Sequence, residues 1–274
     1  MIILKRNHLY LLSILTGILL WAGWPAHGLP LVLLFAFCPL LVVEHHIYSN
    51  RATIGWRSFL GYAFLAMLIW NGLSTWWVCI STIVGGLMAV VFNSFFMAIV
   101  LALFHITKRR IGPISGYASL PIFWLAFEYV HLNWQLSWPW LTLGFGFSNY
   151  TSLIQWYVLT GPLGGTLWIL LCNLAIFNLI KIKWFGKGGN LTYRFRHYVW
   201  PLIFNPIICS VILYWGNYNP GNPLKPVNVV IVQPNIDPYG EKFSGNFAEQ
   251  LNKMFVLADT RVDSNTTYLV FPET

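Results

Sequence analysis

The chain contains 274 residues, of which 57% are hydrophobic, 18% are aromatic and only 9% are charged. Because soluble globular domains carry about 25% charged residues, this composition excludes an ordinary soluble protein and indicates one that crosses a membrane several times. The formal net charge of +8 would suggest a nucleic-acid partner in a soluble protein. In a membrane protein, the distribution of the basic residues carries more information.

Seven apolar runs approach the length of about 20 residues that a helix needs to cross a bilayer. They extend over Leu9–Gly23, Leu29–Tyr48, Trp56–Cys79, Leu87–Thr107, Tyr117–Leu132, Leu163–Ile182 and Tyr198–Gly216. The first run is short, and the fifth contains Glu128, whose charge is costly at the centre of a bilayer. The pattern predicts a polytopic α-helical membrane domain of about seven helices in residues 1–216.

The basic residues alternate along these runs. Twelve of the 16 Lys and Arg residues lie in alternate segments, namely Lys5, Arg6, Arg51, Arg57, Lys108, Arg109, Arg110, Lys181, Lys183, Lys187, Arg194 and Arg196. The intervening segments 24–30, 80–86 and 133–162 contain none. Since Lys and Arg concentrate in cytoplasmic loops, we predict a cytoplasmic N-terminus and, after seven crossings, a C-terminal part on the opposite side of the membrane.

The first apolar run permits a second interpretation. With Lys5 and Arg6 before it, the run could be the hydrophobic region of a signal peptide. This alternative stays open, and it leaves the orientation of the later segments unchanged.

We do not expect a catalytic role for the four cysteines, or for two histidines that lie near the ends of predicted spans. Cys38, Cys79, Cys172 and Cys209 lie in or beside apolar runs, with no C-x-x-C spacing and no neighbouring His or acidic cluster. This spacing indicates neither a metal site nor a disulfide framework, so we expect apolar, buried thiols. We expect His105 and His131 to be interfacial rather than catalytic.

The composition changes abruptly after the last apolar run. A Pro/Gly/Asn-rich stretch within residues 217–226 is typical of a linker between domains. Val227–Gln233 is rich in β-branched residues and predicts a buried strand, Phe247–Ala258 has apolar residues at helical spacing, and Thr267–Phe271 predicts a second strand. A strand–helix–strand order predicts two parallel strands.

Glu273 follows the second predicted strand, directly after Pro272. Ligands of parallel sheets bind beyond the carboxyl ends of the strands, which makes this carboxylate a candidate for catalysis. From residue 217 onward the chain has four basic and six acidic residues, so we expect no nucleic-acid partner for this part. The 48 residues 227–274 are few for a stable α/β domain, and we expect the domain to continue past Thr274.

Five segments carry a resemblance to a known family. They are GWPAHGLPLVLLFAFCPLL (Gly23–Leu41), NGLSTWWVCISTIVGG (Asn71–Gly86), FWLAFEYVHLNWQLSWPWLTLGFGFSN (Phe123–Asn149), VNVVIVQPNIDPYGEKF (Val227–Phe243) and YLVFPET (Tyr268–Thr274). Together they resemble the apolipoprotein N-acyltransferases, the bacterial inner-membrane enzymes that complete lipoprotein maturation. The last two segments are the more specific, since V-Q-x-N/D-I after a strand and a strand that ends in Pro-Glu open the nitrilase-like domain of this family.

The resemblance implies three parts in a multi-pass protein of the bacterial inner membrane. These are a transmembrane domain in residues 1–216, a linker in 217–226 and, in 227–274, the start of a periplasmic α/β domain with the αββα sandwich fold of nitrilases (carbon-nitrogen hydrolases). The family's catalytic groups form a Glu-Lys-Cys triad, of which only the Glu is carried over, as Glu273, the general base. The family's Lys and Cys lie further along, so we expect the chain as given to be inactive.

The implied reaction moves an acyl chain from a phospholipid to the α-amine of the diacylglyceryl-cysteine at the N-terminus of an apolipoprotein. A cysteine nucleophile would carry the acyl chain as a thioester between the two steps. The expected partners are therefore a phospholipid donor, an apolipoprotein acceptor and the membrane, with no cofactor and no metal.

Five further residues are candidates for substrate contact. Lys242 and Phe243 lie where the family usually has Lys-Trp near the active site, and the Phe keeps only the apolar contact of that Trp. Glu128 either contacts a lipid headgroup or substrate, or makes a structural polar contact between helices. Trp138 and Trp140 either line a lipid entry path or belong to an aromatic belt.

Two other functions remain as alternatives. The first is a non-enzymatic polytopic protein, a transporter or lipid-binding scaffold with a vestigial periplasmic stub. It is disfavoured because the spans lack the paired broken helices that mark transporter sites. The second is an enzyme that acts on small amides, as soluble nitrilase relatives do, although seven membrane anchors favour lipid substrates.

Overall fold

The computed structural model describes residues 4–185, 190–217, 226–237, 239–241 and 246–272. It divides into two compact units, and each has its own internal structure. The helical unit consists of Met1–Trp76 and Leu87–Asn217, and the C-terminal unit consists of Trp77–Gly86 and Tyr218–Thr274.

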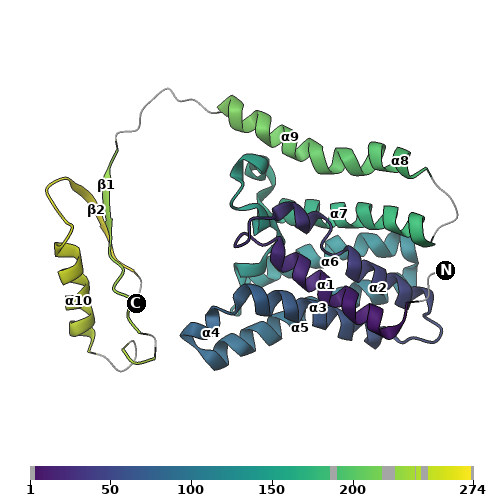
Figure 1. Cartoon of the computed structure of the whole chain (residues 1–274), viewed down its shortest axis with the longest axis horizontal. Helices are drawn as coiled ribbons and strands as arrows, with labels where there is room; N and C mark the ends of the chain where they lie inside the picture. The colour runs from purple at the N-terminus through teal and green to yellow at the C-terminus, as the bar shows by residue number, and fades with distance from the viewer. Residues whose placement is uncertain (1–3, 186–189, 218–225, 238, 242–245, 273–274) are drawn as a thin grey trace. The chain divides into compact units, whose positions relative to one another are not determined.

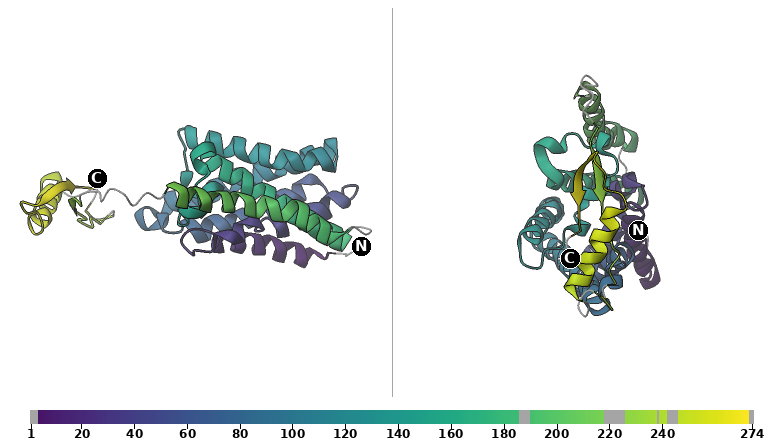
Figure 2. Two further views of the ribbon diagram at one scale, coloured as in Figure 1. Left: turned by 90° about the horizontal axis from the view of Figure 1, so that it is seen from above. Right: turned by 90° about the vertical axis from the view of Figure 1, so that its left-hand side faces the viewer.

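The helical unit is built mainly from long helices that run side by side (Figures 1 and 2). They are α1 (Arg6–Ala22), α2 (Cys38–Ser49), α3 (Trp56–Thr75), α5 (Ile83–Ile111), α6 (Pro113–Asn133), α7 (Tyr157–Phe185) and α9 (Trp200–Asn217). The short elements are the 3-10 turns η1 (Pro30–Leu34), η2 (Pro139–Leu141), η3 (Leu143–Phe147) and η4 (Thr151–Leu153), the single turn α8 (Leu191–Arg194) and the π-helical turn η5 (Phe195–Val199). Each predicted apolar run overlaps one of the long helices.

Among the described residues, five helical segments are long and apolar enough to cross a membrane. They are Pro30–Ser49, Trp56–Thr75, Ile83–Ile111, Tyr157–Trp184 and Leu191–Gly216. Helix α1, with 17 residues, and helix α6 are not among them. The structure therefore supports a protein with several membrane-spanning helices, and the number of seven crossings stays a prediction.

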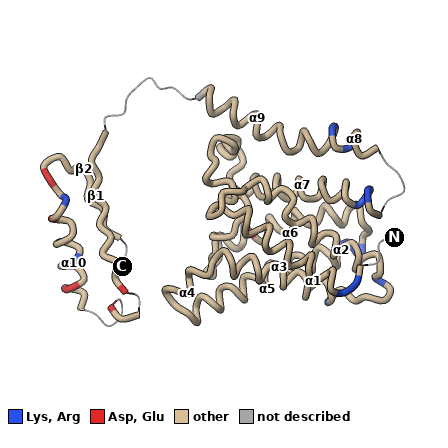
Figure 3. Tube along the Cα trace, in the orientation of Figure 1, with Lys and Arg blue, Asp and Glu red and all other residues tan. Residues whose placement is uncertain are grey.

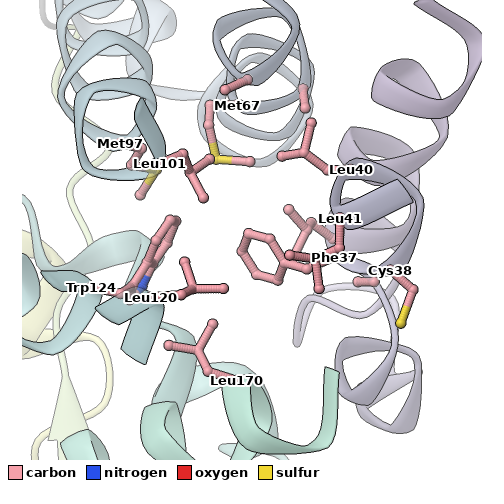
Figure 4. Packing of buried hydrophobic residues seen from close by; sticks show 14 of the residues in the cluster. Phe37, Cys38, Leu40, Leu41, Met67, Met97, Leu101, Leu120, Trp124 and Leu170 are labelled. Carbon is pink, nitrogen blue, oxygen red and sulfur yellow. The ribbon is translucent and has the colours of Figure 1, made fainter. Parts of the chain in front are cut away.

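The core of the helical unit is formed by buried apolar side chains of α2, α3, α5, α6 and α7 (Figure 4). Phe37, next to the start of α2, packs edge-on against Trp124 of α6, with ring centroids 5.2 Å apart. Met67 of α3 and Leu101 of α5 are buried in the same cluster. Helix α6 contributes Leu120 and Trp124 to this core, and it also carries Glu128.

The second apolar run does not form one continuous helix. It is divided into η1 and α2, and the side chain of Asn173 on α7 bridges the division. The Asn173 amide nitrogen donates to the Leu33 carbonyl at 2.7 Å, and its amide oxygen accepts from the Phe37 backbone N–H at 2.8 Å. Backbone polar groups within a membrane need such partners. Asn173 therefore supplies the hydrogen bonds that the backbone loses where the helix is interrupted.

Basic residues gather at one end of the helical unit, whereas the loop that joins α6 to α7 lies at the other end (Figures 1 and 3). The alternation read from the sequence therefore corresponds to a separation in space. Which end faces the cytoplasm stays a prediction.

The C-terminal unit contains α4 (Val78–Ser81) and a strand–helix–strand segment made of β1 (Asn228–Ile231), α10 (Phe247–Asp259) and β2 (Thr266–Val270). The two strands pair in parallel, with Val229 opposite Tyr268, which confirms the predicted order and direction. The side chain of Asn246 caps α10 by accepting from the Ala248 backbone N–H at 2.9 Å.

The sheet of the C-terminal unit is only two strands wide among the described residues, and most of its apolar side chains are exposed. Val232, Met254 and Ala258 form a small buried cluster between strand and helix. In contrast, 74% of Ile231 is exposed. The βαβ segment is therefore shown, whereas its place in a nitrilase-like sandwich stays a prediction.

Candidate functional site

Glu128 is the centre of a buried polar cluster in the helical unit. It lies one helical turn after Trp124 on α6, and residues four apart share a helix face. The Trp124 indole N–H donates to Glu128 Oε1 at 2.9 Å. Only 3% of Glu128 is exposed, so this carboxylate depends on protein partners.

Two further donors reach the Glu128 carboxylate from other elements. The Leu143 backbone N–H, at the start of η3, donates to Oε1 at 2.9 Å. The Thr166 hydroxyl on α7 donates to Oε2 at 2.6 Å and itself accepts from the Gly144 backbone N–H at 2.9 Å. One carboxylate therefore joins α6, η3 and α7, and we call Trp124, Glu128, Leu143, Gly144 and Thr166 the Glu128 cluster.

Close packing at Gly144 completes the attachment of this loop to α7. A Cβ atom at Gly144 would lie 1.8 Å from the Pro162 carbonyl oxygen, so a larger residue does not fit. The Tyr157 hydroxyl donates to the Gly144 carbonyl at 3.1 Å. Helix α7 is interrupted at Gly161, whose φ of 65° favours glycine, and this interruption brings Pro162 against the loop.

The loop held in this way is residues 134–156, which contains both predicted substrate-contact tryptophans. Leu141 and Leu143 of this loop are buried in the core of the helical unit. Trp138 is half-buried, and 53% of Trp140 is exposed. The structure thus brings Glu128, Trp138 and Trp140 into one region, through a loop that Glu128 positions.

For Glu128, this geometry supports the structural alternative, because all three of its hydrogen bonds are to groups of the protein, and two of them join α6 to η3 and α7. Substrate contact by Glu128, Trp138 or Trp140 stays a prediction. The other three predicted site residues, Lys242, Phe243 and Glu273, lie outside the described residues. Strand β2 ends at Val270, directly before the Phe-Pro-Glu segment that carries Glu273.

A second buried cluster was missed by the sequence reasoning. Glu44 of α2 accepts from His105 Nδ1 at 2.7 Å and forms a short ion pair with Lys108, also on α5. Lys108 Nζ also donates to the Tyr117 hydroxyl of α6 at 2.7 Å. It lies 4.4 Å from the centroid of the Tyr48 ring and 4.0 Å from that of the Tyr117 ring. We call Glu44, Tyr48, His105, Lys108 and Tyr117 the Glu44 cluster.

The Glu44 cluster corrects one expectation. Lys108 was placed in a loop, yet it lies on α5 and its side chain is fully buried against α2. The His105 side chain is also fully buried, and its position at the membrane interface stays a prediction. The available signal was Glu44 itself, a charge within the second apolar run. A buried charge requires an opposite partner, and Lys108 is the cation that the packing supplies.

The fold defines the class of protein: a helical membrane protein with several crossing helices, joined to a small parallel βαβ unit. Residues 16–175 match the family model described as the apolipoprotein N-acyltransferase N-terminal domain. This match covers more than half of the chain and includes every member of both clusters. The chain belongs to this family.

Two curated relatives extend the comparison. Over 270 residues the chain is 29% identical to a protein named apolipoprotein N-acyltransferase from Chlorobaculum tepidum, covering 97% of this chain and 49% of that protein. Over 249 residues it is 25% identical to a protein of the same name from Geobacter metallireducens, covering 88% of this chain and 46% of that protein. The chain spans about half the length of the curated relatives it matches.

Proposed function

We propose that the protein acts in the transfer of an acyl chain from a membrane phospholipid to the N-terminal amine of an apolipoprotein. One observation carries the proposal: the alignment with the Chlorobaculum tepidum protein covers 97% of the chain. It therefore includes the C-terminal unit as well as the helical unit. A scaffold that shared only membrane helices with the family would not need the second unit.

In this proposal, Glu273 is the general base. It takes the proton of a cysteine thiol, and the thiolate attacks the sn-1 ester carbon of the phospholipid. A lysine stabilises the oxyanion that forms. Collapse of this intermediate breaks the ester bond, releases the lysophospholipid, whose alkoxide takes the proton, and leaves a thioester. The lysine and the cysteine that the family resemblance implies are not assigned to residues of this chain.

The second half-reaction returns the thiol. The apolipoprotein amine attacks the thioester carbon, the C–S bond breaks, and the amine proton passes through Glu273 to the departing thiolate. Both substrates carry acyl chains that lie in the bilayer. The membrane-spanning helices therefore keep the enzyme in the same membrane as its substrates. We place the βαβ unit, residues 227–274, at the start of a nitrilase-like αββα domain on the periplasmic side of the inner membrane, with the N-terminus in the cytoplasm.

The proposal is tested by expressing the reading frame that contains these 274 residues in bacteria depleted of their own N-acyltransferase. Mass spectrometry of a lipoprotein's N-terminal peptide measures the product. We expect a mass gain of one acyl chain on the amine. Absence of this gain, with the protein present in the membrane fraction, would support the scaffold alternative.

A further inference from the structure

A small pocket of about 190 Å³ lies between α6 and α7. It is lined by Tyr117 of α6 and by Leu174, Phe177, Asn178 and Lys181 of α7, and we call it the Lys181 pocket. Sites for drug-sized ligands measure about 300 to 1,000 Å³, so this pocket is suited to a smaller group. Asn178 and Lys181 are both half-buried, so each keeps part of its surface accessible to an occupant.

Lys181 is a cation for which the helical unit offers no carboxylate. Residues 1–217 contain only two acidic residues, Glu44 and Glu128. Glu44 is fully buried and pairs with Lys108 and His105, and Glu128 is held within the Glu128 cluster. Among the residues that the structure describes, Lys181 forms no ion pair. Its positive charge therefore lacks a counter-charge in this unit.

The surroundings of Lys181 add positive charge and a further donor. Its ammonium nitrogen lies 5.5 Å from the centroid of the Tyr117 ring, and that of Lys108, which already has a carboxylate partner, lies 4.0 Å from the same centroid. Arg194 of α8 is close enough to Lys181 for the two cations to repel each other. Asn178 contributes an uncharged amide to the same pocket. These groups together favour an anion as the occupant.

The pocket lies near the end of an apolar helix. The helical segment Tyr157–Trp184 is long and apolar enough to cross a membrane, and Lys181 is three residues before its end, a rise of about 4.5 Å. The headgroup layer adds about 5 to 7 Å to each side of the hydrocarbon core. Basic residues gather at this end of the helical unit (Figure 3). In a bilayer, the Lys181 pocket is therefore level with the phosphate groups of the lipids.

We propose that the Lys181 pocket binds a phosphate group, carried either by a lipid headgroup or by free phosphate. The Lys181 ammonium and the Asn178 amide donate to phosphate oxygens, and the phosphate supplies the counter-charge that the helical unit lacks. The pocket lies at the end of the unit opposite the 134–156 loop (Figure 1). Its test measures binding and not acyl transfer, so it fails or succeeds independently of the proposed function.

The experiment titrates the purified protein in detergent and derives the Kd from the rise in Tm that a bound ligand causes. Sodium phosphate is compared with sodium chloride at equal ionic strength. Dioctanoyl-phosphatidylglycerol is compared with dioctanoylglycerol, which has the same acyl chains and no phosphate. We expect a saturable rise in Tm with a phosphate-bearing probe and none with chloride or dioctanoylglycerol. A response to phosphatidylglycerol alone assigns the site to a lipid headgroup, a response to sodium phosphate alone assigns it to free phosphate, and a response to both shows that it accepts either.

Three variants make the test specific. Lys181→Gln removes the charge from the pocket, whereas Lys183→Gln removes the same charge from an exposed position two residues later on α7. We expect Lys181→Gln to raise the Kd by about tenfold or more, the ratio that one charged hydrogen bond gives, and Lys183→Gln to leave it within about twofold. Asn178→Leu removes an uncharged donor and should raise the Kd by about fivefold. The Tm of each variant without ligand shows whether it is folded.

Three results would overturn the proposal. Equal losses of affinity in Lys181→Gln and Lys183→Gln would show general attraction to the basic end of the helical unit. An unchanged Kd in both Lys181→Gln and Asn178→Leu would place the phosphate elsewhere. The absence of a Tm rise with either phosphate-bearing probe, or an equal rise with dioctanoylglycerol, would show that the pocket does not recognise phosphate.

Discussion

At the scale of single residues, the carboxylate of Glu128 accepts hydrogen bonds from three donors, for which no other acceptor is found among the described residues. Glu128→Ala leaves these buried donors unpaired, so we expect a loss of about 3 kcal/mol or more in stability. Glu128→Gln keeps an acceptor for Trp124 and Leu143 and disturbs only the bond with Thr166, so its cost should be about 1 kcal/mol.

The measurement for Glu128 is thermal unfolding of the protein in detergent, together with protease cleavage within residues 134–156. We expect a lower Tm and faster cleavage for Glu128→Ala. Glu249→Ala, an exposed carboxylate on α10, serves as the control, because such surface changes stay within about 0.5 kcal/mol. An unchanged Tm in Glu128→Ala would refute the positioning role.

The Glu44 cluster makes a different prediction, because two charges there compensate each other. Lys108→Met leaves the Glu44 carboxylate buried without its cation, so we expect a loss of about 3 to 5 kcal/mol. The double variant Glu44→Gln with Lys108→Met should be more stable than the sum of the two single losses predicts. A double-mutant cycle of unfolding free energies measures this coupling, and strictly additive losses would contradict it.

At the scale of elements, the sequence predicted what local patterns determine. The β-branched runs and the helical spacing between them predicted the parallel β1–α10–β2 order, which the structure confirms. Each predicted apolar run overlaps a long helix. In contrast, the division between η1 and α2 depends on Asn173, which lies 136 residues after Phe37 along the chain. No local pattern in the second run contains that information.

The candidate site divides in the same way. Glu128 was singled out because a carboxylate in an apolar run is unusual, but its partners Leu143 and Thr166 depend on how the loop folds back onto α7. The pairing of Glu44 with Lys108 depends on which faces of α2 and α5 meet. Local sequence predicts that such charges need partners, whereas tertiary packing decides which partners they find.

The contact between the η3 turn and α7 can be tested at Gly144. Gly144→Ala places a Cβ atom against the Pro162 carbonyl, so we expect a loss of about 1 to 3 kcal/mol. Gly72→Ala is the matched control, because a Cβ atom at Gly72 in α3 meets nothing within 4 Å. Alanine is the better helix former by about 1 kcal/mol, so this control should be neutral or stabilising. Equal Tm values for the two variants would contradict the close packing.

At the scale of the whole molecule, the separation of basic residues predicts the orientation in the membrane. We expect alkaline phosphatase, which is active only in the periplasm, to be active when fused after residue 217 and inactive when fused after residue 110. Immunoblots of the two fusions control for their amounts. Activity of the fusion after residue 110 would reverse the proposed orientation.

The chain belongs to the family, and the alignment with the Chlorobaculum tepidum protein covers both of its units. The central claim of the proposed function is that Glu273 is the general base of acyl transfer at the membrane. The most direct measurement compares Glu273→Gln with Glu249→Gln in the protein expressed from the reading frame that contains these residues, by following lipopeptide acylation against time at equal protein levels. Loss of a general base lowers reaction rates by about 10²- to 10⁴-fold. We therefore predict that Glu273→Gln lowers the acylation rate by at least about 10²-fold and that Glu249→Gln leaves it unchanged. A normal rate in Glu273→Gln would contradict the claim.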